Sequence, residues 1–78
     1  MLTHSKMTSF IASERDGNVI IRVAGQQVAN YPGKIPVCVI VWINGWLSSV
    51  GLTHTVKKFS CHNYNGSPRI IAIVERAE

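Results

Sequence analysis

Hydrophobic residues are concentrated in one uncharged segment near the middle of the chain, residues 35–43 (IPVCVIVWI). Val and Ile occupy every second position of this segment, while Cys38, Ile40 and Trp42 fall between them. Because side chains alternate between the two faces of a strand, a strand of this composition is apolar on both faces. The pattern therefore predicts a central strand that the rest of the chain covers on both sides.

Two shorter apolar segments precede it, residues 8–13 and residues 19–24. Asp16 and Gly17 lie between them, and both residue types tolerate the positive φ values that a tight turn requires. We expect a β-hairpin over residues 8–24. Residues 25–34 contain the turn-forming sequence Tyr-Pro-Gly and are predicted to be a connector.

Residues 53–64 have the composition of a strand, but their apolar positions change phase. Val56 belongs to one face, whereas Phe59 and Cys61 belong to the other. The change coincides with the dipeptide Lys-Lys at 57–58. A β-bulge at this point, or an edge strand protected by lysines, would account for it.

The end of the chain resembles its middle. Residues 65–68 (NGSP) are turn-forming, and residues 69–74 (RIIAIV) are again apolar on both faces. We expect residues 69–74 to form an inner strand beside the central one.

Asn44 and Gly45 allow two interpretations. As a two-residue turn they would fold residues 46–50 back against residues 39–43. Alternatively, Asn44 would cap a short helix that ends at Gly51. Val50 and the two serines before it favour helix only weakly, so local propensity favours the hairpin.

These patterns predict a mainly β protein: a small single domain, residues 1–78, built as an antiparallel sheet or barrel-like fold of five or six strands. The alternative at Asn44 adds one short helix near residues 45–51. Residues 1–7 and 75–78 are expected to be loose tails.

Composition constrains the partner more than the fold. Eight Lys and Arg residues against four Asp and Glu give a net charge of +4 over 78 residues, which suits nucleic acid or an acidic protein surface as partner. Charged residues make up only 15% of the chain. A chain of this size gains stability by association, so we expect a homodimer formed through exposed strand edges.

The start of the chain lacks the apolar region of a signal peptide, and no apolar segment is long enough to span a membrane as a helix. We therefore expect a cytoplasmic protein with reduced cysteines and no membrane association.

The residues that most often carry catalysis are poorly placed for it. Cys61 and His62 are adjacent, so on a strand they point to opposite faces and cannot act as nucleophile and base. His54 and His62 lie too far apart along a strand for a metal site. Phosphate-binding glycine motifs are absent. We expect no enzyme activity, metal, cofactor or small-molecule substrate.

The basic residues of the strands are the better candidates for a binding site. If the strands pair, their side chains can gather on one face and neutralise phosphates. Exposed aromatic side chains on the same surface would stack on bases. The predicted nucleic-acid or partner-binding residues are Lys57, Lys58, Arg69, His54, Arg22, Tyr64 and Trp46.

A family resemblance points the same way. Over residues 29–75 the chain resembles SymE-type toxins of the AbrB-like swapped-hairpin group, through Tyr31-Pro32, Ile35-Pro36, Trp46-Leu47 and Gly51-Leu52 followed by two strands. The resemblance implies an intertwined homodimer that acts on nucleic acid, by DNA binding or condensation or by toxicity directed at RNA. It also implies a helix over residues 46–51.

Two functions follow from these observations. The first is a small basic nucleic-acid-binding protein, a dimeric SymE-like toxin or regulator. The alternative is a non-catalytic inhibitor from a phage or mobile element, which binds a host protein through a strand edge or an aromatic surface.

Overall fold

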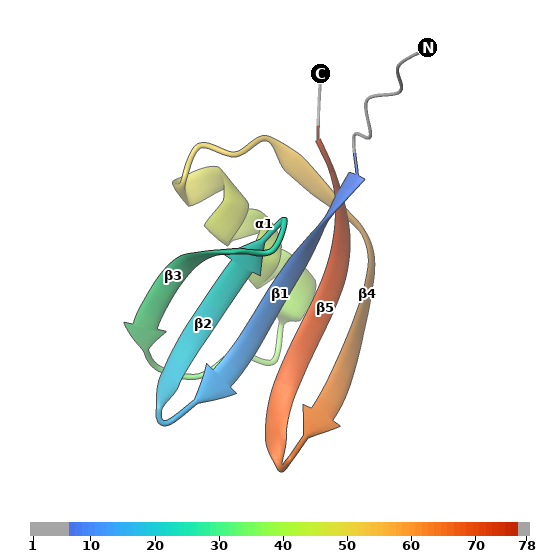
Figure 1. The fold of residues 1–78 in the computed structure, drawn as a ribbon. Coiled ribbons are helices and arrows are strands. Elements are labelled where there is room, and N and C mark those ends of the chain that lie inside the picture. Colours follow the sequence, from blue (N-terminus) through green and yellow to red (C-terminus); the bar gives the residue numbers. More distant parts are fainter. Residues whose placement is uncertain (1–6, 77–78) are drawn as a thin grey trace.

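The computed structural model describes residues 7–76, which form five strands and one helix. They follow in the order β1 (Met7–Arg15), β2 (Asn18–Val23), β3 (Gln26–Pro32), α1 (Val39–Ser49), β4 (His54–Tyr64) and β5 (Ser67–Arg76) (Figure 1). The strands form one sheet in the order β3-β2-β1-β5-β4, in which every neighbouring pair is antiparallel. The predicted fold class, a small mainly β domain, is confirmed.

The predicted tails lie mostly outside the described residues. Of the segment 1–7 only Met7 is described, and it begins β1. At the other end Glu75 and Arg76 continue β5, while residues 77 and 78 are not described.

The largest correction concerns residues 35–43, which do not form a strand. Helix α1 begins at Val39, and the residues just before it are irregular. Ile43 and Leu47 lie four residues apart, and both are buried. This helical spacing becomes visible only when the pattern is followed past Asn44. The burial of this apolar stripe outweighs the weak helix propensity of the Val and Ile residues.

The hairpin predicted at Asn44 and Gly45 is therefore wrong, because both residues lie inside α1. The helix alternative was right in kind, although the helix starts at residue 39.

The two ends of helix α1 differ in their capping. The N-terminal end has no capping hydrogen bond from the side chain of Cys38. At the C-terminal end the Leu52 N–H donates to the Leu47 carbonyl at 2.9 Å, after Gly51 at φ 79°.

The β1–β2 hairpin is confirmed, with Asp16 and Gly17 at φ 52° and 80°. The connector predicted over residues 25–34 is wrong for its larger part, because Gln26–Pro32 is strand β3. A second tight turn at Ala24 and Gly25, both at positive φ, returns the chain to the sheet. Alanine seldom adopts that conformation, so the sequence did not reveal this turn.

Strand β4 confirms the prediction made from its change of phase. The pairing of β4 with β5 shifts register between Val56 and Lys58, and β4 lies at one edge of the sheet. Strand β5 is an inner strand as expected, but its other neighbour is β1, because residues 35–43 are not part of the sheet.

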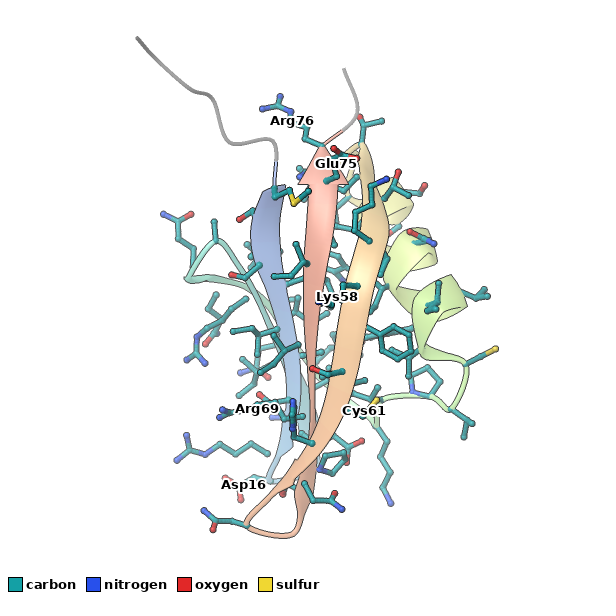
Figure 2. The ribbon with its side chains drawn as sticks, turned by 90° about the vertical axis from the view of Figure 1, so that its right-hand side faces the viewer. Asp16, Lys58, Cys61, Arg69, Glu75 and Arg76 are labelled. Carbon is teal, nitrogen blue, oxygen red and sulfur yellow. The ribbon has the colours of Figure 1, made fainter. Side chains whose placement is uncertain are left out.

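Helix α1 packs on one face of the sheet, and the core lies between the two layers. Trp42 and Trp46 of α1 make edge-to-face contacts with Phe10 of β1. The ring centroid of Phe10 lies 6.3 Å from that of Trp42 and 5.8 Å from that of Trp46. The buried core residues are Phe10, Ala12, Val19, Ile21, Ile43, Leu47, Ile70, Ala72 and Val74. Within residues 7–76 no helix covers the opposite face, which we call the open face (Figure 2).

Candidate functional site

The strand register determines which side chains share the open face. Residues opposite one another in antiparallel strands point to the same side of the sheet. Ile11 lies opposite Arg22 on β2 and Ile71 on β5. The open face is formed by Met7, Ser9, Ile11, Ser13, Arg15, Asn18, Ile20, Arg22, Thr55, Lys58, Ser60, His62, Ser67, Arg69, Ile71, Ile73 and Glu75.

Basic residues lie in neighbouring rows of this face. His62 is opposite Arg69, which is opposite Ser13 on β1. Arg69 and Arg22 flank β1 on either side, so two strand spacings, about 10 Å, separate them across the sheet. In Figure 2, which looks onto the β4 edge, Arg69 lies on the side away from α1.

Three arginines line a hollow in the sheet. It lies toward the end that carries the β1–β2 and β4–β5 turns, which Figure 1 shows at the same end of the sheet. Its volume is about 390 Å³. The residues lining this arginine hollow are Ser13, Glu14, Arg15, Ile20, Arg22, Asn65, Ser67, Pro68 and Arg69. Guanidinium groups beside hydroxyl and amide donors suit an anion such as a phosphate group.

Two carboxylates lie near these basic residues. Glu14 lines the hollow, but its Oε2 accepts a hydrogen bond from the Ile35 backbone N–H at 2.8 Å. Glu75 forms an ion pair with Lys57, with 3.1 Å between Oε1 and Nζ. Arg22, which is exposed, makes no ion pair within the described residues. Basic side chains therefore outnumber carboxylates on the open face of the described chain.

Strand β4 adds two polar side chains to the open face. Ser60 Oγ and His62 Nε2 are 3.1 Å apart on the exposed side of this edge strand. The pair adds a hydroxyl and an imidazole beside Arg69, both of which can hydrogen-bond to phosphate or sugar oxygens.

The structure brings together three of the seven predicted site residues on the open face: Arg22, Lys58 and Arg69. Lys57 lies at the neighbouring bulge and is held by Glu75. The other predicted residues are placed differently.

His54 lies opposite Arg76, at a position whose side chain points to the helix side of the sheet. It is half-buried, and its Nδ1 has no hydrogen-bond partner among the described residues. Trp46 is also half-buried on the helix side, against Phe10. Tyr64 lies opposite Ser67, but its side chain is outside what the structure describes.

Sequence reasoning did not select Arg15, His62 or Ser13. A usable signal existed for His62: a two-residue turn at Asn65 and Gly66 pairs residue 64 with residue 67, and so residue 62 with residue 69. The position of Arg15 depends on the curvature of the whole sheet, which the local pattern does not encode.

Two further kinds of site find no support in the described part of the chain. Residues 7–76 contain no group of three His, Cys, Asp or Glu residues placed to hold a metal ion. The one helix among them is too short to cross a membrane.

Comparison with known protein families, curated proteins and solved structures finds no match to this chain. The open face is therefore the feature of the molecule from which a function is inferred.

Proposed function

We propose that the protein binds nucleic acid through the open face, with phosphate groups held by Arg22, Arg69 and Lys58. The observation that supports this most is the excess of basic over acidic side chains on that face, where Glu75 is paired with Lys57. Phosphate contacts release counterions, so they supply affinity that falls steeply with salt.

The apolar residues of the open face indicate what kind of binding to expect. Ile11, Ile20, Ile71 and Ile73 lie between the basic residues, and all four are half-buried. Isoleucine packs against sugars and base edges but offers no ring for stacking and no hydrogen bond for reading a sequence. We therefore expect binding with little sequence preference, which is the mode typical of phosphate contacts.

The test compares two double variants that lose the same charge. Arg22→Ala with Arg69→Ala removes two charges from the open face. Lys34→Ala with Arg76→Ala removes two from exposed positions outside it. Binding of a labelled single-stranded oligonucleotide and of a duplex is measured by fluorescence anisotropy at several salt concentrations. Circular dichroism confirms that each variant is folded.

In a plot of log affinity against log salt concentration, the slope for the open-face variant should be less steep by about 1.4–1.8, which is about 0.7–0.9 for each lost phosphate contact. The control variant should change it much less. Equal losses in both variants would show that net charge alone attracts the polyanion. No binding by the unmodified protein at 50 mM salt would refute the proposal.

A second function is favoured by a separate observation. Val37 is 99% exposed and Val41 is 68% exposed, at the start of a helix without a charged side chain. An uncharged apolar surface of this kind is typical of protein interfaces. It supports an inhibitor function, with α1 as the docking surface in place of the strand edge or aromatic surface expected from the sequence.

The two functions respond oppositely to salt and to substitution. A complex formed by α1 should persist at 0.5 M salt and should be lost on Val41→Asp, which introduces a charge on an exposed position. Nucleic-acid binding through the open face should show the reverse, because Val41 lies on the other side of the sheet.

A further inference from the structure

The free edge of β4 changes character along its length. Lys57 and Lys58 occupy the bulge, and charges of this kind discourage pairing with another strand. From Phe59 to the end of the strand there is no Lys, Arg, Asp, Glu or Pro. The far edge of the sheet, β3, instead ends at Pro32, which has no backbone N–H to donate.

The turn after β4 determines which backbone groups point outward. Asn65 and Gly66 have φ of 52° and 80°, as in a two-residue type I′ turn. In such a hairpin Tyr64 and Ser67 exchange hydrogen bonds, and every second pair along the ladder does the same. The intervening residues of β4 direct their N–H and C=O groups to the free edge: Phe59, Cys61 and Asn63.

All three of these residues are exposed, and two carry apolar or weakly polar side chains toward the helix side. Phe59 is 39% exposed, opposite Ala72, and Cys61 is opposite Ile70. Figure 2 shows Cys61 on the helix side of the β4 edge. A strand added here would gain backbone hydrogen bonds and would cover part of Phe59.

We propose that this edge, residues 59–63, pairs antiparallel with the same edge of a second copy of the chain. Charge favours this occupant. In a register centred on Cys61, Lys58 lies opposite Tyr64 of the second copy, and Ser60 lies opposite His62. No two like charges then face each other, and each strand supplies the hydrogen-bond pattern that the other needs.

The pairing has a defined geometry. Opposed residues of an antiparallel pair share a face, so both α1 helices lie on one side of a ten-stranded sheet, and both open faces lie on the other. The basic surfaces of the two copies thereby become continuous. The pairing itself does not depend on the proposed function and is measured without nucleic acid.

The two native cysteines test the contact directly, because both are exposed. Cys38→Ser leaves only Cys61, and Cys61→Ser leaves only Cys38 as the matched control. Cysteines directly opposite one another would have Cα atoms about 5.5 Å apart, which suits a disulfide. In a register shifted by one pair they would be diagonal neighbours at roughly 7–8 Å, which a short bis-maleimide spans.

We expect rapid crosslinking to a dimer for Cys38→Ser and at most slow crosslinking for Cys61→Ser. Sedimentation equilibrium of the unmodified reduced protein should show a monomer–dimer equilibrium. Equal crosslinking of both variants, or a monomer at every concentration up to the solubility limit, would overturn the proposal.

A charge at the centre of the contact provides a second test. Cys61→Lys opposes two ammonium groups in the paired edge and should weaken dimerisation at least about tenfold. Val28→Lys adds the same charge on β3, where Val28 is 47% exposed, and should leave dimerisation unchanged. Thermal unfolding verifies that both variants fold. A Cys61→Lys protein that dimerises as tightly as the Val28→Lys protein would refute the edge pairing.

Discussion

The two faces of the sheet are built from the same strands but are stabilised differently. On the helix side Ile70, Ala72 and Val74 of β5 are nearly or fully inaccessible to solvent. On the open face Ile71 and Ile73 of the same strand are only half-buried. The helix therefore stabilises one face, and nothing in the described chain covers the other.

Neighbouring long side chains explain why the open face tolerates isoleucine. Ile73 lies opposite Lys58, and Ile11 lies opposite Arg22. The aliphatic stems of Lys and Arg pack along apolar surface while their charged ends stay in water. A segment that is apolar on both faces thus need not be covered on both faces, provided that its neighbours are amphipathic.

The largest loss of stability is expected from substitution of Phe10, which is fully buried and contacts both tryptophans of α1. Phe10→Ala should cost about 3–5 kcal/mol, which is most of the stability expected for a domain of this size. Ile11→Ala, the next residue on the opposite face, should cost less than about 2 kcal/mol because no cavity closes around it. Urea denaturation followed by circular dichroism measures both, and similar losses would contradict the difference between the faces.

A smaller effect is expected from adding volume at Ala72, which is fully buried on the helix side. Ala72→Leu should destabilise the fold by about 1–3 kcal/mol through overpacking. Ile71→Leu keeps the side-chain volume on the open face and should change stability by less than about 0.5 kcal/mol. The difference between their thermal midpoints is the measurement, and a stabilising Ala72→Leu would show unfilled space in the core.

Glu14 links the two faces, because it lines the arginine hollow and accepts the hydrogen bond from Ile35. Glu14→Gln keeps the shape and removes the charge. We expect a loss of stability of about 1 kcal/mol, since a charge-assisted hydrogen bond is weakened. The same variant should bind nucleic acid more tightly at low salt, because the hollow gains positive potential. Weaker binding with unchanged folding would argue against the hollow as an anion site.

The smallest effect concerns Tyr31, which packs on the core from β3. Burial raises the pKa of Tyr31 above its usual 10.0, and a hydrogen bond with Trp42 opposes the shift. A raised pKa in the folded state means that folding favours the neutral phenol. The resulting stability is full below pH 10.0 and is lost as pH rises through the folded-state value. Tyr31→Phe should remove this part of the alkaline decline, measured as thermal midpoints between pH 8 and 11.

The sequence predicted the parts of the fold that are determined locally. The turn at Asp16-Gly17 and the bulge at Lys57-Lys58 follow from residue type and from a change of phase. Strand β3 was missed because its glutamines, Asn30 and Pro32 resemble a loop, and only pairing with β2 makes it a strand. The N-terminal part of helix α1, residues 39–43, was missed because its β-branched residues alternate like a strand, whereas docking on Phe10 selects the helical spacing.

The candidate site was predicted to a similar extent. Arg22, Lys58 and Arg69 were selected as basic residues of predicted strands, and the strand register places all three on one face. Trp46 was included as an aromatic residue that would stack on bases if exposed. Because its segment is a helix, Trp46 is half-buried and packs against the core. Its placement therefore depends on the type of element that carries it.

The unequal ends of α1 have a consequence for how the protein moves. The C-terminal end is closed by the Leu52 to Leu47 hydrogen bond, whereas the N-terminal end has no side-chain cap, and Gly45 within the helix lowers its intrinsic stability. Local opening should thus begin at Val39 and proceed toward Leu47, while the strands stay paired. The amide protons of Trp42 and Ile43, the first that helical hydrogen bonds protect, would then exchange with deuterium well before those of β5.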